Sequence, residues 1–224
     1  MCHMKEIELL EKYLSETRMQ RIDEVLKQRT RDVCVIIDRL DKAHNYMAIM
    51  RTMDAFGIQD AHIVPLESDD NGTISKKVTQ GAHKWLTIHM HKSWRECFDA
   101  VKKEGYKIYA SYLDDNAKGL ESLDLSGKVA LLFGNELKGL EKEEVKACDG
   151  VFILPMVGFS QSYNVSVASA LTLQRFFLRR EELQLGRGHL SEQETLKLKT
   201  LWYKKAVQNS EVILKEELRR IEEK

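Results

Sequence analysis

Three polar segments of this 224-residue chain carry residue types that could bind a ligand or act on one. One of them lies between Leu154 and Leu173, where two apolar ends flank the run Gly158-Phe159-Ser160-Gln161-Ser162-Tyr163-Asn164. Ser162 and Asn164 can cap a helix that begins just after this run. Capping accounts for one of these polar side chains but not for all of them. We therefore expect this segment to hold a ligand against its backbone.

The second segment is LLFGNELKGL, residues 131–140. Gly134 and Gly139 bracket Asn135 and Glu136, so backbone amides can approach a ligand closely while Glu136 offers an acceptor. The segment is not a GxGxxG sequence, and it lacks the GKS or GKT of a P-loop. This composition disfavours both a dinucleotide-binding and a triphosphate-binding protein.

The third segment is HNYMAIMRTMDAFGI, residues 44–58. Asn45 can cap a helix there, and Arg51 lies nearly two turns further along among apolar positions. An arginine in this setting can be the structural partner of a carboxylate. It can also be a fixed cation directed at a phosphate or at a reacting oxygen. Both interpretations stay open at this level.

Apolar strands alternate with helices along the chain and would position these segments. Apolar runs predict strands over residues 33–38, 61–66, 106–113, 128–134 and 151–154, with a weaker one around 86–89. Apolar spacing of three or four residues predicts helices over residues 5–30, 45–56, 93–105 and 141–148, then from 165, and from 191 to about 223. Strands that are apolar throughout indicate a mostly parallel sheet with helices on both faces. Such sheets bind ligands at the carboxyl ends of their strands, where all three segments fall.

The composition is that of a folded, non-membrane protein. Hydrophobic residues make up 43% of the chain and charged residues 31%, which excludes a disordered protein. The chain has no apolar stretch of about 18 residues and no signal-peptide pattern, so we expect a cytoplasmic protein that spans no membrane. The four cysteines form no CxxC pair and the histidines lack metal-ligand spacing, which predicts free thiols and no metal site.

The charge of the chain is balanced but unevenly distributed. Thirty-five basic residues match 35 acidic ones, which alone argues against a nucleic-acid-binding protein. Basic residues nevertheless gather in residues 17–31, 75–92 and 174–205. Any one such run is typical of a solvated helix face, but three of them around one core favour a polyanionic partner.

Taken together, residues 44–57, 131–140 and 153–171 resemble a set of three known motifs. They are similar, in order and in separation, to those of the SpoU/TrmH branch of the SPOUT RNA 2′-O-methyltransferases, and the resemblance covers roughly residues 33–178. It implies an α/β fold with a deep trefoil knot at about residues 128–178, and S-adenosylmethionine as methyl donor with no metal required. It also implies a homodimer in which the first motif of one subunit meets the third motif of the other.

The same resemblance assigns roles to individual residues. The cofactor would be bound by residues of four strand ends and loops: Ser111, Leu132, Gly134, Asn135, Glu136, Gly139, Leu154, Met156, Ser162, Tyr163 and Asn164. The catalytic group would consist of Arg51, Asn45, Glu136, Ser162 and Asn164. In the family the arginine is proposed as a base, but the guanidinium pKa lies above about 12. We expect it instead to hold a phosphate and the hydroxyl together and to stabilise the developing alkoxide.

The layout of the chain indicates which RNA it acts on. A short basic helical extension (residues 1–32), a methyltransferase domain (33–178) and a C-terminal helical extension (179–224) resemble the family members that methylate guanosine 18 in the tRNA D-loop. The expected tRNA contacts are Arg18, Arg21, His44 and Lys84, with Arg175, Arg179 and Arg180 as weaker ones. Two alternatives are a methyltransferase acting on ribosomal RNA and a non-catalytic RNA-binding protein on the same scaffold. The helix after residue 165 would place part of its apolar face, Val165, Val167, Ala168, Leu171 and Leu173, in the dimer interface.

Overall fold

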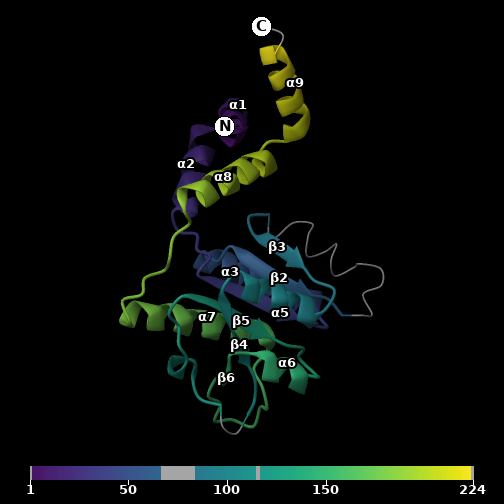
Figure 1. Ribbon diagram of the computed structural model, residues 1–224, viewed down its shortest axis with the longest axis vertical. Coiled ribbons are helices and arrows are strands. Elements are labelled where there is room, and N and C mark those ends of the chain that lie inside the picture. Colours follow the sequence, from purple (N-terminus) through teal and green to yellow (C-terminus); the bar gives the residue numbers. More distant parts are fainter. Residues whose placement is uncertain (1, 67–83, 115–116, 223–224) are drawn as a thin grey trace. The chain divides into compact units, whose positions relative to one another are not determined.

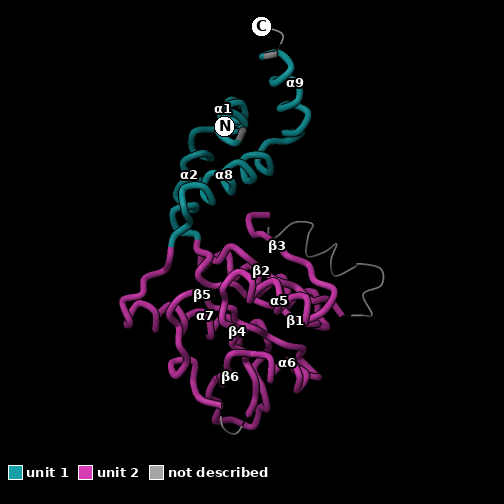
Figure 2. The backbone as a smooth tube through the Cα atoms, in the orientation of Figure 1, with its two compact units in different colours: residues 1–29, 189–224 teal, residues 30–188 magenta. Residues whose placement is uncertain are grey.

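The computed structural model describes residues 2–66, 84–114 and 117–222. These residues form two compact units, residues 1–29 together with 189–224, and residues 30–188 (Figure 2). No helix of the described ranges is long and apolar enough to cross a membrane.

The larger unit is built on a six-stranded sheet whose paired strands all run parallel (Figure 1). Its order is β3 (Thr87–Met90), β2 (Asp60–Val64), β1 (Val33–Asp38), β5 (Lys128–Phe133), β4 (Tyr106–Ser111) and β6 (Gly150–Phe152). The chain builds outward from β1 in one direction and returns to fill the other side, so the strand order reverses between β1 and β5. This is the point at which open α/β sheets bind ligands. The predicted mostly parallel α/β sheet is confirmed.

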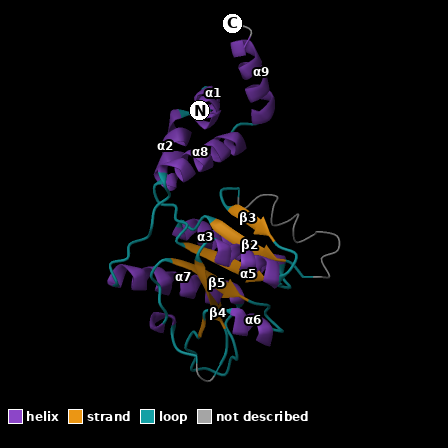
Figure 3. Ribbon diagram, in the orientation of Figure 1, coloured by secondary structure: helices purple, strands orange, loops and turns teal. Residues whose placement is uncertain are grey.

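Helices cover both faces of this sheet (Figure 3). Helices α3 (Ala43–Phe56) and α7 (Val165–Glu182) pack on the face that carries Val33, Val35 and Ile37. Helices α5 (Trp94–Lys103) and α6 (Lys142–Ala147) pack on the opposite face, with Cys34 and Ile36. A single 3₁₀ turn, η1 (Leu120–Ser122), precedes β5. Because both faces of β1 are covered, all six of its residues are buried, which explains its continuous apolar sequence.

The smaller unit consists of helices from both ends of the chain. Helices α1 (Cys2–Glu11) and α2 (Glu16–Leu26) pack against α8 (Glu192–Ala206), and α9 (Ser210–Glu222) packs against α1 and α8. Arg29 is buried here with its guanidinium 5.1 Å from the ring centre of Trp202. Ion pairs join Lys204 to Glu6 at 2.7 Å and Lys199 to Asp23 at 2.7 Å. The two terminal segments therefore stabilise each other.

Two long helices predicted from the sequence are each interrupted. The helix predicted over residues 5–30 is wrong, because Ser15 begins a new helix and its Oγ accepts the Arg18 N–H. The helix predicted from 191 to 223 breaks near Asn209, which has a left-handed backbone with φ +57°. A hydroxyl cap and a left-handed residue both end helical hydrogen bonding locally. The predicted boundary after residue 178 falls inside α7, which continues to Glu182.

Candidate active site

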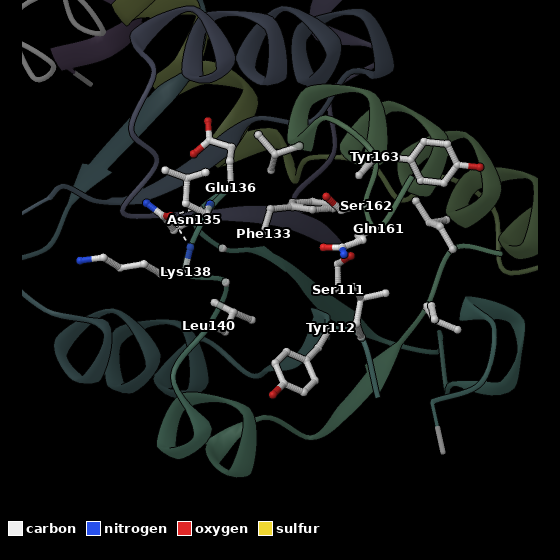
Figure 4. A pocket seen from close by; sticks show the side chains of 18 of the residues that line it. Ser111, Tyr112, Phe133, Asn135, Glu136, Lys138, Leu140, Gln161, Ser162 and Tyr163 are labelled. Carbon is white, nitrogen blue, oxygen red and sulfur yellow. Dashed lines mark hydrogen bonds between the residues drawn. The ribbon is translucent and has the colours of Figure 1, made fainter. Parts of the chain in front are cut away.

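A cavity of about 350 Å³ opens at the carboxyl ends of β4, β5 and β6. Its walls come from four segments and two residues of α7, namely 111–113, 133–140, 152–156 without Pro155, 161–163, Val165 and Ala168. Figure 4 shows the polar side chains of Ser111, Gln161 and Ser162 among the lining residues, with the loop from Asn135 to Leu140 on the other side of the view. The volume lies within the range of small-molecule sites, roughly 300–1,000 Å³.

Most of the residues expected to bind the cofactor line this cavity. The exceptions are Leu132 and Asn164. Leu132 is buried on the sheet face that α5 and α6 cover, and Asn164 lies just beyond the lining segment 161–163. Several other lining residues were not predicted from the sequence: Tyr112, Leu113, Leu137, Lys138, Leu140 and Ile153. These residues follow strands or sit in turns and have no side-chain type that indicates a ligand.

Two glycines shape the loop after β5. A Cβ atom on Gly134 would lie 2.6 Å from Cδ2 of Leu140, so a larger residue would collide there. Gly139 has φ +67°, a left-handed backbone that residues with a Cβ rarely adopt. The loop can therefore fold tightly and bring its backbone to the cavity wall.

Asn135 holds this loop closed through its side chain. Its Oδ1 accepts the backbone N–H of Leu137 at 2.9 Å and of Lys138 at 2.8 Å. Its Nδ2 donates to the carbonyl oxygen of Arg39 at 2.6 Å. The loop after β5 is thereby fixed both internally and to the end of β1.

A chain of hydrogen bonds links all three polar segments. The Glu136 carboxylate accepts Nδ2 of Asn45 at 2.5 Å and the N–H of Asp41 at 3.0 Å. Asn45 in turn accepts Nδ2 of Asn164 at 3.3 Å through its Oδ1. Four of the five expected catalytic residues belong to this chain or to the cavity wall, and Arg51 is the exception.

Asn45 does not cap its helix as predicted. Helix α3 begins two residues earlier, with Lys42 as its N-cap residue and no side-chain cap bond. Asn45 lies in the first turn and is 1% exposed. Because the helix starts early, the Asn45 side chain does not bond to the backbone of its own first turn. Its amide instead donates to Glu136, which is distant in the sequence.

The loop before α7 is held at both of its ends. Asn164 is the N-cap residue of α7, and its Oδ1 accepts the Ser166 N–H at 2.9 Å, as predicted. Ser162 lines the cavity and does not cap the helix. The Tyr163 hydroxyl donates to the carbonyl oxygen of Pro155 at 3.1 Å, which closes the loop, while Phe159 between them is fully exposed.

Arg51 is exposed on α3 and does not line the cavity. Among the described residues it has neither a hydrogen-bond partner nor an ion-pair partner. The structural alternative, a buried arginine paired with a carboxylate, therefore finds no support in the described part of the chain.

A second hollow lies beside the first, along α7. It has a volume of about 320 Å³ and is lined by Leu154, Pro155, Tyr163, Leu171, Gln174, Arg175 and Leu178. Val167, Leu171 and Leu178 are exposed on this helix, whereas Val165 and Leu173 are buried in the core. Helix α7 thus presents an exposed apolar strip, Val167, Leu171 and Leu178, next to the cavity.

The expected RNA contacts differ in their accessibility. Arg18 and Arg21 are exposed on α2, and His44 and Lys84 are exposed on the larger unit. Arg21 forms an i,i+3 ion pair with Glu24 at 3.1 Å, a contact that water and salt screen strongly. The half of the basic run over residues 75–92 that precedes Lys84, with Lys76 and Lys77, lies outside the described residues.

Two of the weaker candidates, Arg175 and Arg179, form ion pairs near the surface. Arg175 pairs with Glu121 at 3.4 Å and Arg179 with Glu182 at 2.8 Å. Both pairs involve exposed or half-buried side chains, so an RNA phosphate could compete for either arginine.

Arg180 is a structural residue, and its prediction as an RNA contact is wrong. It is 3% exposed, and Nη2 donates to Asp32 at 2.9 Å. Its other N–H groups donate to the carbonyl oxygens of Gly186, Leu125 and Gly127 at 3.0–3.2 Å. These bonds join the end of α7 to the turn before β5 and leave no donor for a phosphate.

A buried group of His62, His91 and Cys97 lies between β2, the end of β3 and α5. One possible ligand atom from each lies within 4.8 Å of the others. Sequence spacing gave no sign of this group because its members come from three separate elements. Nδ1 of His62 and Nε2 of His91 are hydrogen-bonded at 3.0 Å, and burial lowers the pKa of His62 to about 3. We assign this neutral pair, with the Cys97 thiol, to core packing.

These features define a class of protein. A parallel α/β sheet with a small-molecule cavity at the carboxyl ends of β4, β5 and β6, walled by two tight loops, is the arrangement of a ligand-binding α/β protein. The linked carboxylate and amides beside the cavity, together with the exposed Arg51, which has no partner in the described part of the chain, indicate an enzyme more than a passive binding protein.

Comparison with known proteins identifies the family. Residues 32–174 match the SpoU rRNA Methylase family, and the chain belongs to this family. It is 31% identical over 210 residues to a tRNA (guanosine(18)-2'-O)-methyltransferase of Borreliella burgdorferi, covering 94% of this chain and 95% of that protein.

Solved structures of RNA-modifying enzymes share the fold of this chain. The crystal structure of the A. aeolicus TrmH/SpoU tRNA modifying enzyme has a TM-score of 0.75 and 33% identity, and covers 87% of this chain and 98% of its own. An AdoMet-bound rRNA methyltransferase from Sinorhizobium meliloti has a TM-score of 0.56 and 25% identity, and covers 72% of this chain and 60% of its own.

Proposed function

We propose that this chain transfers a methyl group from S-adenosylmethionine to the ribose 2′-hydroxyl of guanosine 18 in the D-loop of tRNA. The relative that matches almost the whole chain bears this activity in its name. The observation that carries the proposal is the cavity at the carboxyl ends of β4, β5 and β6, walled by the loops after β5 and before α7.

The residues of this cavity suit an adenosyl cofactor. Gly134 and Gly139 let the backbone of one wall come close to a bound molecule. Ser111, Gln161 and Ser162 add hydroxyl and amide groups, while the cavity also has apolar lining such as Leu154. When bound, the cofactor supplies a methyl group already activated by its sulfonium sulfur, so the chemistry requires no metal.

The proposed active form is a homodimer with a shared site. The exposed apolar strip of α7 and the hollow beside it offer a surface for a second copy of the chain. Arg51, which has no partner in its own subunit among the described residues, would then face the cavity of the other subunit. We further propose that residues 128–178 form the deep trefoil knot of the family, with the loop before α7 as part of it.

As the 2′-oxygen takes the methyl group, its proton would pass to solvent water, and the chain's own residues would assist this loss and orient the ribose. Arg51 of the partner subunit would hold a phosphate of the target nucleotide and stabilise the negative charge developing on the 2′-oxygen. The hydrogen-bonded residues Glu136, Asn45 and Asn164 would hold the two loops and the start of α3 together beside that oxygen. A guanidinium stays protonated at neutral pH, so an electrostatic role fits Arg51 better than that of a base.

The terminal segments would bind the body of the tRNA. We propose that Arg18 and Arg21 of residues 1–32 and Arg179 of residues 179–224 contact tRNA. The domain of residues 33–178, which carries the cofactor site, would add His44, Lys84 and Arg175 as contacts. We also propose a cytoplasmic location, because tRNA, the proposed substrate, is found there. Contacts to phosphates make binding weaker as salt increases, because condensed counterions are no longer released as favourably.

Methyl transfer to defined RNA tests this proposal. Unmodified tRNA transcript and ribosomal RNA fragments are incubated separately with methyl-labelled S-adenosylmethionine, and the labelled nucleotide is mapped. Label on the ribose of guanosine 18 supports the proposal. Label only in ribosomal RNA favours the alternative suggested by the family description. Cofactor binding without label in either RNA would indicate a non-catalytic RNA-binding protein.

A further inference from the structure

Arg39, directly after β1, has an unusual backbone. Its φ of +50° lies in the left-handed region, which non-glycine residues other than Asn and Asp rarely adopt. The conformation costs on the order of 1 kcal/mol, so the surroundings must hold it in place. Arg39 was not among the functional residues predicted from the sequence.

The Arg39 guanidinium joins the end of β1 to the start of α6. Nε donates to Asp38 at 2.9 Å, Nη1 to Glu141 at 2.5 Å and Nη2 to Glu144 at 2.5 Å. Glu141 is the N-cap residue of α6, and Glu144 closes a capping box by accepting the Glu141 N–H at 2.7 Å. Helix α6 directly follows the cavity loop, so Arg39 anchors the far end of that loop.

The backbone of Arg39 holds the near end of the same loop. Its carbonyl oxygen accepts Nδ2 of Asn135 at 2.6 Å, and its N–H donates to the carbonyl oxygen of Val64 at 2.7 Å. Asn135 lines the cavity and fixes the turn that follows it. A single residue outside the cavity wall thus contacts both ends of the loop that forms part of it.

The charges around Arg39 make its removal costly. Asp38 is 1% exposed and Glu144 is 0% exposed, and Arg39 is the cation that both contact. Burial first, and then the neighbouring Glu144, raise the pKa of Asp38 to about 7. Two buried carboxyl groups without the guanidinium would repel each other when ionised, or would turn away toward water.

We propose that Arg39 is a positioning residue for the methyl donor, acting through Asn135 and α6 to hold the loop of residues 134–141 in its binding shape. This inference rests on the proposed function, because it concerns the affinity of that site for S-adenosylmethionine. It assigns Arg39 no contact with the donor or with RNA.

The test compares two substitutions with a matched control. Arg39→Gly keeps the left-handed backbone and removes the guanidinium, while Arg39→Lys keeps the charge and only part of the contacts. Lys107→Ala breaks a different ion pair, with Asp124, near the other end of β4 from Ser111. For each full-length protein, calorimetry gives the Kd of S-adenosylmethionine. Methylation assays with tRNA as the acceptor give the KM for S-adenosylmethionine and the kcat.

We expect Arg39→Gly to raise both the Kd and the KM for S-adenosylmethionine about tenfold or more, the scale of one lost charge-assisted contact. At saturating donor its kcat should stay within about threefold of wild type, because Glu136, the one catalytic residue of this loop, keeps its own hydrogen bonds to Asn45 and Asp41. Arg39→Lys should recover part of the affinity, and Lys107→Ala should match wild type.

A wild-type Kd in Arg39→Gly, or a loss confined to kcat, would overturn the inference. If Arg39→Gly fails to fold by circular dichroism, Glu141→Gln decides the matter, since Glu141 is exposed and this change weakens only one arm of the contact. Glu141→Gln should raise the Kd about threefold, and an unchanged Kd would count against the inference. Absence of donor binding by wild type would instead refute the proposed function.

Discussion

Replacing Glu136 by alanine probes the hydrogen bonds that connect the three polar segments. The carboxylate accepts the N–H of exposed Asp41 and the amide of buried Asn45. Water can replace Glu136 at Asp41, but the Asn45 amide would lose its acceptor inside the protein. A buried polar group left without a partner costs about 1–3 kcal/mol.

Taking about 2 kcal/mol, kcat/KM for tRNA methylation should fall about 30-fold in Glu136→Ala. Glu136→Gln keeps an oxygen that can accept the Asn45 amide but loses the charge. Because charge-assisted bonds are roughly twice as strong as neutral ones, this variant should lose about fivefold. Incorporation of labelled methyl at several tRNA concentrations, with the donor below saturation, gives these ratios.

The matched control is Glu143→Ala, which removes an exposed glutamate of α6 that has no partner among the described residues. It should keep the wild-type rate. Thermal unfolding of all three variants checks that they are folded. A Glu136→Ala enzyme within threefold of wild type would refute the reasoning, because the linked amides would then contribute nothing to the reaction.

Three other substitutions have defined outcomes. Gly134→Ala places a methyl group against Leu140, so calorimetry should show at least about tenfold weaker binding of S-adenosylmethionine, and unchanged affinity would contradict the tight loop. Burial raises the pKa of Asp38 in the folded protein to about 7, whereas the ordinary value of an unfolded chain is about 4. The protonated carboxyl therefore stabilises the fold fully below about pH 4, and this stabilisation is lost as the pH rises to about 7. In urea titrations the free energy of unfolding of Asp38→Asn, relative to wild type, should therefore rise over this range by at most about 1.4 kcal/mol per pH unit, whereas parallel profiles would argue against the raised pKa. Arg180→Ala should lower the free energy of unfolding by about 3 kcal/mol because it leaves Asp32 and four carbonyl groups without their donor, and a loss below about 1 kcal/mol would be inconsistent with that role.

The sheet was predictable because its physical signal is local and repeated. The run at Val33–Asp38 is apolar at nearly every position, which requires cover on both faces, and α3, α5, α6 and α7 provide it. Asn164 was also predicted correctly as a cap, since a cap depends on residues within one turn. Placement of three polar segments at strand ends followed from the same pattern.

Contacts between segments distant in the sequence could not be predicted from local residue patterns. Asn45 has the residue type of a cap, but its amide bonds to Glu136, which lies 91 residues away. Arg180 was predicted as an RNA contact from its place in a basic run, but in the fold it donates to carbonyl groups of the turn before β5. Arg39 has no unusual neighbour in the sequence, and its left-handed backbone depends on carboxylates more than 100 residues further on.

Mixed dimers test the central claim most directly, namely that the cavity of one subunit works with Arg51 of the partner subunit. Arg51→Ala and Asn164→Ala chains carrying different tags are co-expressed, and the heterodimer is isolated by two affinity steps. Each variant homodimer should be nearly inactive. The heterodimer contains one site with both an intact cavity and an intact arginine, so it should reach about half of the wild-type activity per dimer. A heterodimer as inactive as both homodimers would show that Arg51 and the cavity act within a single chain.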